Sequence, residues 1–149
     1  MRSDNLVKIA DNRVHLEDVS YGILNGFYID TEMSGQSDSN LHWISEDKSF
    51  SIDVCTADAN NENFIECFAK YFPDDYKKLV DFTEFEYNGL TGVYVIIGLS
   101  ASESFEFKAY ADKEKTKFID VVIETKNGNI NNVLKLKTVQ DFLHDIRMD

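Results

Sequence analysis

Both cysteines of the chain, Cys55 and Cys67, lie in one stretch, IDVCTADANNENFIECF (52–68), with a run of Asp, Asn and Glu between them. Residues of these types can bind a metal ion or form a redox pair. Eleven residues separate the two cysteines, which is not the spacing of a zinc or redox motif, and no further ligand lies nearby in the sequence. We therefore expect two free thiols, with Cys67 a small core residue and Cys55 on the polar face of a strand.

The same stretch has the 1-3-5 spacing of a calcium-binding loop, in Asp58, Asn60 and Glu62. Such a loop needs a glycine at its sixth position for the sharp turn and a bidentate glutamate at its twelfth. This chain has Asn63 and Ala69 at those positions. The sequence therefore favours a polar cap before a helix, and we expect neither a metal ion nor another cofactor.

Motifs typical of catalysis are incomplete or missing from the sequence. GLSAS (98–102) is similar to the nucleophile elbow of serine hydrolases, but Ser102 stands where that motif needs its last glycine, and two predicted strands flank it. A hairpin turn is the better interpretation. The three histidines are scattered, and HExxH, P-loop and GxGxxG motifs are missing. We expect a non-catalytic protein; the alternative is a small-ligand-binding domain or a small enzyme with an unrecognised pocket.

Acidic residues outnumber basic ones by 27 to 15, which gives a net charge of −12. Such a surface repels the phosphates of nucleic acids and of anionic membranes, so we expect neither as a partner. The charge favours a basic protein surface, and our main prediction is an acidic binding or accessory protein that engages one. The simpler interpretation is that the acidic excess only keeps the protein soluble.

The chain is expected to form a single domain over residues 1–149, because no linker divides it and its length is typical of one domain. The start, MRSDNLVKIADNRV, lacks the apolar core of a signal peptide, and no apolar run of roughly 18 residues occurs. We therefore expect a cytoplasmic protein, unless an export signal has been removed. The sequence does not predict an oligomeric state.

Hydrophobic periodicity divides the chain into strands and helices. Apolar residues at helical spacing predict a long helix over Phe64–Tyr71, with a turn or two more after Pro73, and a C-terminal helix over 138–148 with Thr138 as its N-cap. Alternation predicts strands at 41–45, 50–56, 82–87, 90–100, 104–111 and 117–125, with a weaker candidate at 25–33. Segments 13–19 and 129–137 stay unassigned.

Short connections such as Asn88-Gly89 imply antiparallel pairing of successive strands. We therefore predict an α+β fold, in which a central antiparallel sheet of about six strands has the long helix and the C-terminal helix packed on it, like an α/β/α sandwich.

The segments LHWIS and FSIDV, the helix at Phe64–Tyr71 and the terminal FLHDI give an order of elements over residues 25–149 that resembles the PsbP-like α/β/α sandwich superfamily. That group includes photosystem accessory proteins, bacterial lipoproteins and Ran-binding nuclear import factors. The resemblance implies a binding or accessory role. No binding residue of the group maps onto this chain.

The strands after residue 81 supply the candidate site. Alternation can place one apolar set on the core face: Phe85, Tyr87, Val93, Val95, Ile97, Phe105, Phe107, Ala109, Ile119, Val121 and Ile123. The opposite face is then acidic with embedded tyrosines, which suits protein binding. Its candidate partner-binding residues are Glu84, Glu86, Tyr94, Glu106, Tyr110 and Glu124. A merely solvated face is one alternative, and partial cover by a helix, which Ile96 would fit, is another.

Overall fold

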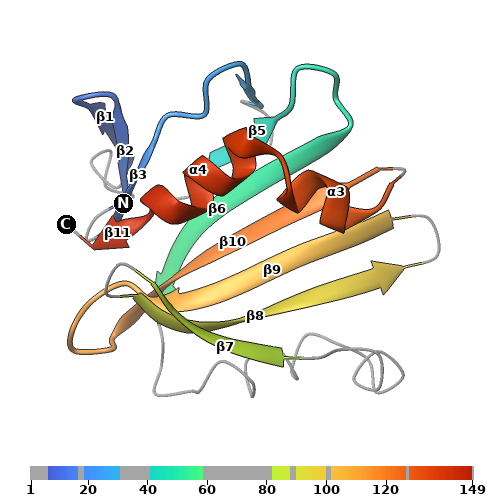
Figure 1. Ribbon diagram of the computed structural model, residues 1–149. Coiled ribbons are helices and arrows are strands. Elements are labelled where there is room, and N and C mark those ends of the chain that lie inside the picture. The colour runs from blue at the N-terminus through green and yellow to red at the C-terminus, as the bar shows by residue number, and fades with distance from the viewer. Residues whose placement is uncertain are drawn as a thin grey trace.

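The computed structural model describes residues 7–16, 19–30, 41–58, 82–87, 90–99, 102–126 and 128–148. This part of the chain is mostly strand, in two antiparallel sheets of four and seven strands, with two short helices near the C-terminal end (Figure 1). The fold is therefore α+β but dominated by strands, and the expected single sheet of about six strands is wrong in number. The predicted helix over 64–71, its continuation beyond Pro73 and the expected core position of Cys67 lie outside the described residues.

The small sheet pairs strands from the N-terminal part of the sequence with one strand from its C-terminal part, in the order β1-β2-β3-β11. Its strands are β1 (Val7–Ala10), β2 (Arg13–Leu16), β3 (Val19–Gly22) and β11 (Arg147–Met148). Asp11 and Asn12 connect β1 to β2 with φ of 56° and 61°. Asp and Asn tolerate this left-handed conformation, which a two-residue hairpin turn needs.

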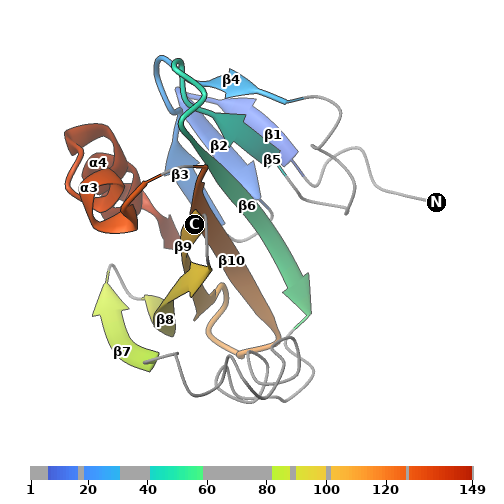
Figure 2. The ribbon, with the colours of Figure 1, turned by 90° about the vertical axis from the view of Figure 1, so that its right-hand side faces the viewer.

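The large sheet has the order β4-β5-β6-β10-β9-β8-β7. Its strands are β4 (Tyr28–Ile29), β5 (Leu41–Ile44), β6 (Phe50–Asp58), β7 (Phe82–Tyr87), β8 (Leu90–Leu99), β9 (Ser102–Tyr110) and β10 (Lys117–Thr125). The six strands predicted from alternation are confirmed, and the weaker candidate at 25–33 forms only the two residues of β4. The sheet twists, so that β7 and β8 turn toward the side that carries the helices (Figure 2).

Leu99 at the end of β8 pairs with Ser102 at the start of β9. The GLSAS segment therefore connects two antiparallel strands, as a hairpin does. This confirms the prediction that it is not a nucleophile elbow, because an elbow joins a strand to a helix.

The two faces of the large sheet differ in what packs on them. The first face carries the helices and the main core, including Ile52, Val121 and Phe107, which are nearly or completely buried. The second face, opposite, carries residues such as Cys55, Asp120 and Lys108 at the alternate positions of β6, β10 and β9.

Strand β8 does not have the orientation predicted from the sequence. The predicted core face groups Val93, Val95 and Ile97 with Phe105 and Phe107. The register instead pairs these three residues with Lys108, Glu106 and Ser104, and it pairs Ile96 with Phe105. Val93 and Val95 thus lie on the second face, while Tyr94 and Ile96 join the first.

The two described helices are α3 (Ile130–Leu134) and α4 (Lys137–Asp145). The predicted apolar stripe of the C-terminal helix is confirmed, since Val139 and Phe142 are buried against the core. Its predicted N-cap, Thr138, is wrong: Leu136 occupies that position and makes no side-chain capping bond. The helix also ends at Asp145, before the predicted end at 148, because Ile146 is extended and leads into β11.

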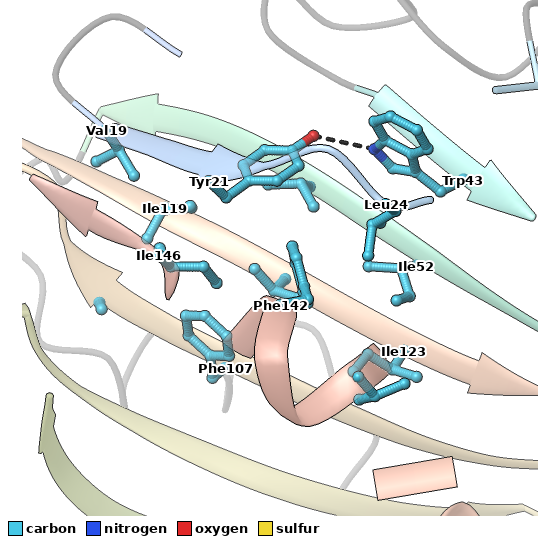
Figure 3. Packing of buried hydrophobic residues seen from close by; sticks show 14 of the residues in the cluster. Val19, Tyr21, Leu24, Trp43, Ile52, Phe107, Ile119, Ile123, Phe142 and Ile146 are labelled. Carbon is cyan, nitrogen blue, oxygen red and sulfur yellow. Dashed lines mark hydrogen bonds between the residues drawn. The ribbon is translucent and has the colours of Figure 1, made fainter. Parts of the chain in front are cut away.

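One hydrophobic core runs between the two sheets and α4 (Figure 3). Tyr21 of β3 lies at its centre, with its ring 5.3 Å from that of Phe142 and 6.4 Å from that of Trp43. The indole Nε1 of Trp43 donates a hydrogen bond of 2.9 Å to the Tyr21 hydroxyl. This buried bond joins β3 of the small sheet to β5 of the large one.

Candidate functional site

The register brings five of the six predicted partner-binding residues to the second face of the large sheet. Glu84 pairs with Val93, Glu106 with Val122, and Tyr110 with Phe118, which puts these residues in the same alternation as Lys108. Glu86 and Glu124 follow the same alternation in β7 and β10.

Tyr94 is the exception, because it pairs with Phe107 on the first face. Its ring lies 5.4 Å from the ring of Phe105 and 6.2 Å from that of Phe85. The prediction that all six residues share one face is therefore wrong for Tyr94. It belongs instead to an aromatic cluster on the helix side of the sheet.

The five residues on the second face do not make one continuous exposed surface either. Glu84, Glu86 and Glu124 are exposed. Between them the face is occupied by buried residues, among them Val95 and Lys108. The expected row of mutually repelling, solvated carboxylates is thus interrupted in the middle of the sheet.

Glu106 is part of a buried polar cluster with Lys108 and Asp120. The Nζ atom of Lys108 lies 3.3 Å from Glu106 Oε2 and 3.1 Å from Asp120 Oδ2. It also lies 4.8 Å from the centre of the Phe118 ring, within the range of a cation–π contact. Only 5% of Lys108 is exposed, so its charge is neutralised inside the protein. This pairing removes Glu106 from the exposed acidic residues.

The electrostatics of this cluster follow from its burial. Burial, and then the neighbouring Asp120 carboxylate, raise the pKa of Glu106 to about 8, although Lys108 acts in the opposite direction. Burial and the nearby carboxylates likewise raise the pKa of the Cys55 thiol to about 12. Cys55 is a free cysteine, as predicted, and at neutral pH it is held as the weakly reactive thiol.

Metal ligands do not gather in the described part of the chain: no group of three or more His, Cys, Asp or Glu side chains there is placed to hold an ion. Of the calcium-like spacing only Asp58 is described, at the exposed end of β6. The rest of that stretch lies outside the described residues. Within the same described ranges, no helix is long and apolar enough to cross a membrane.

A cavity of about 220 Å³ lies between β7, β8 and β9 and the C-terminal end of α4. Four aromatic residues of the sheet line it: Phe85, Tyr94, Phe105 and Phe107. Their rings pack edge-to-face or tilted, with the centres of Phe85 and Phe107 5.5 Å apart. Such packing holds the aromatic surface in a fixed shape.

The remaining residues that line this cavity are aliphatic or polar, and the polar ones are exposed. Leu90, Leu143 and Ile146 complete the apolar lining, while Glu86 and His144 also line it and are both exposed. Glu86 reaches the mouth from β7, the edge strand of the large sheet. The cavity is thus an apolar hollow with a carboxylate and an imidazole at its entrance.

This cavity was not predictable from the sequence alone. Its lining comes from three strands and a helix that are distant in the chain, and one of its aromatic residues, Tyr94, lies on a strand whose orientation the alternation did not fix. The only available signal was the Asn88-Gly89 turn, which determines that orientation once the turn length is used.

Comparison with known proteins gives a match in fold. No family model matches the chain, and no curated protein matches its sequence. The Ran-binding protein Mog1p of Saccharomyces cerevisiae has a similar structure, with a TM-score of 0.55 and 10% sequence identity over 94% of this chain and 96% of that one. A point mutant of protein Mog1 gives a TM-score of 0.53 at 10% identity, over 93% and 96% of the two chains. The predicted resemblance, which covered the group with Ran-binding import factors, is therefore confirmed at the level of the fold.

Proposed function

We propose that this protein is a non-catalytic binding protein that engages a basic surface of another protein through β7 and the cavity beside it. The observation that carries the proposal is the position of two exposed glutamates, Glu84 and Glu86, on the edge strand that borders an apolar, aromatic-walled cavity. An apolar centre with charge at its rim is the usual composition of a protein-binding surface.

The net charge of −12 supports a basic partner. Charges of this sign steer a cationic protein toward the acidic molecule and raise the association rate, most strongly at low ionic strength. The yeast protein of similar fold is a Ran-binding protein, so the same architecture serves protein binding elsewhere.

Three of the six residues predicted from the sequence belong to the proposed surface: Glu84, Glu86 and, from the cavity side, Tyr94. Glu106 does not, because it is largely buried in the cluster with Lys108 and Asp120. Tyr110 and Glu124 lie away from β7, on β9 and β10, and Tyr110 has the Nζ of Lys115 5.3 Å from its ring.

The alternative, a small-ligand-binding domain or small enzyme, has less support from the cavity. Pockets for small molecules measure roughly 300–1,000 Å³ and contain several convergent polar groups. The cavity beside β7 has about 220 Å³, and its two polar lining residues are at the mouth.

The proposal predicts a salt-dependent association that needs the glutamates of β7. A partner is first captured from a native cell extract, and its association rate is then measured for the double variant Glu84→Gln/Glu86→Gln. We expect association roughly 3- to 10-fold slower than wild type at low salt and within about twofold of it at 0.5 M salt, because screening removes the steering.

The matched control is Glu46→Gln/Glu124→Gln, which removes two charges from exposed positions in the β5–β6 turn and on β10, which is separated from β7 by two strands. It should change the rate by less than about twofold, since rim charges act mainly near the contact. Equal rates for the β7 variant and wild type at low salt would reject the proposed surface.

A further inference from the structure

The cavity between β7 and α4 has the size of one large side chain. An apolar cavity of roughly 150 Å³ is known to admit benzene, and the cavity here measures about 220 Å³. A phenyl or isobutyl group therefore fits, with room for the bonds that connect it to a chain. A drug-sized molecule does not, because its pocket begins at roughly 300 Å³.

The lining of the cavity suits an apolar side chain and disfavours a charged group. Seven of the nine lining residues are aromatic or aliphatic, and they include Phe105 and Phe107, which are almost fully buried. A cationic head group inside would lose its hydration without a buried carboxylate in the lining to replace it. The apolar body of a side chain meets no such penalty, and aromatic walls favour a ring that packs edge-to-face.

The residues at the mouth of the cavity determine which residues can flank that side chain in the bound segment. Glu86 lines the entrance, and Glu84 is two residues away on the same exposed edge strand. Glu84 follows the alternation of the second face, so it adds charge to this edge strand without lining the cavity. In an extended segment bound here, residues next to the inserted one would lie close to Glu86, since neighbouring residues in a strand rise about 3.3 Å each. Lysine or arginine at those positions would be paired.

We infer that the cavity is the anchor pocket for one large apolar side chain, of the size of Phe or Leu, carried by a basic segment of the partner protein. This inference rests on the proposed function and specifies its partner. A few buried anchor residues, surrounded by contacts that exclude water, carry most of the binding energy of a typical protein interface.

The test uses the full chain and two blocked peptides, Lys-Lys-Phe-Lys-Lys and Lys-Lys-Ala-Lys-Lys, titrated by NMR with methyl signals of Leu90, Leu143 and Ile146 as reporters. We expect the Phe peptide to bind wild type roughly 10- to 100-fold more tightly than the Ala peptide, which is the effect of burying one large apolar side chain. Only the Phe peptide should shift the three methyl signals strongly.

Two variants separate the pocket from the charges. Leu143→Phe extends a wall residue into the cavity and should abolish the advantage of the Phe peptide while leaving the Ala peptide unaffected. Leu134→Phe makes the same change at a half-buried residue of α3 that does not line the cavity, and should preserve the advantage. Glu84→Gln/Glu86→Gln should weaken both peptides by a similar factor.

The outcomes that contradict the inference differ from those that contradict the proposed function. If both peptides bind with equal affinity, and both affinities fall in Glu84→Gln/Glu86→Gln, the pocket is not an anchor site. The proposed acidic binding surface is then still supported. If neither peptide depends on these glutamates, the proposed function fails as well. If free toluene shifts the three methyl signals while the Phe peptide does not, the cavity takes a small apolar molecule and the inferred occupant is wrong.

Discussion

Along β9, charged and aromatic residues alternate, and each set has a separate task. Phe105 and Phe107 line the cavity on the first face, while Glu106 and Lys108 enter the buried polar cluster on the second. The sequence predicted that Glu106 would point away from the core. It did not predict the burial of Glu106, because the pairing of Lys108 with Asp120 depends on β10 lying beside β9 in the right register.

At the residue scale, the raised pKa of Glu106 predicts how stability depends on pH. The carboxyl ionises near pH 4.5 ordinarily and near pH 8 in the folded protein. Between these values the folded state holds a proton that the unfolded state has released, so the free energy of unfolding falls as pH rises, by up to about 1.4 kcal/mol per pH unit. Glu106→Gln cannot ionise and should remove this slope. Its stability relative to wild type should therefore be more favourable at pH 8 than at pH 5.

Urea denaturation at pH 5, 6.5 and 8 measures this difference. Glu114→Gln, at an exposed position in the β9–β10 connection, is the control and should follow wild type at all three values. Parallel pH profiles for Glu106→Gln and wild type would show that the buried carboxyl does not titrate in this range.

At the element scale, the strands were predictable and the orientation of one of them was missed. Alternation located β7 and β10 to the residue. It could not orient β8, because that strand is apolar at consecutive positions, Val93 to Ile97, so both faces fit. The turn contained the missing information. A two-residue Asn88-Gly89 loop pairs Tyr87 with Leu90 and therefore Phe85 with Gly92, which turns Tyr94 toward the helices.

The same register predicts that Gly92 cannot be replaced. A Cβ atom there would overlap the carbonyl oxygen of Lys108 and would lie 2.7 Å from the Cα of Ala109, so β8 would have to move away from β9. Gly92→Ala should destabilise the protein by about 1–3 kcal/mol or more, the usual cost of overpacking. Gly128→Ala is the control, because nothing lies within 4 Å of a Cβ atom built there. It should stay within about 0.5 kcal/mol of wild type in the same denaturant titration. Equal stability of the two variants would mean that β8 and β9 pair in another register.

At the scale of the whole molecule, the small sheet was the part of the fold that the sequence pattern did not predict. Its four strands are two to four residues long and come from both ends of the chain, so none gives the extended alternation that identifies a strand. Arg147 and Met148 lie within the range predicted for the C-terminal helix, yet they pair with β3. The cavity was not predicted for a similar reason, since its lining combines residues of β7, β8 and β9 with residues at the end of α4 that are distant in the sequence.

The buried bond between Tyr21 and Trp43 leads to a prediction about the molecule as a unit. We propose that the chain unfolds as a single domain, because Tyr21 of the small sheet packs on both Trp43 of the large sheet and Phe142 of α4. Tyr21→Phe removes the hydroxyl that accepts the indole hydrogen bond and leaves a buried N–H group without it. The expected cost is about 1–3 kcal/mol. In a single domain, that cost must appear equally in every probe of unfolding.

Trp43 is the only tryptophan of the chain, so its fluorescence reports one place in the core while far-ultraviolet circular dichroism reports all the strands. The two thermal transitions should coincide in wild type and should move down together in Tyr21→Phe, by roughly 2–4 °C per kcal/mol. Tyr28→Phe deletes the same hydroxyl from a side chain in β4 that is 56% exposed, and should leave both transitions in place. If fluorescence and circular dichroism separate, or if Tyr21→Phe shifts only the fluorescence, the two sheets unfold independently, because a shared core would transmit the loss to both.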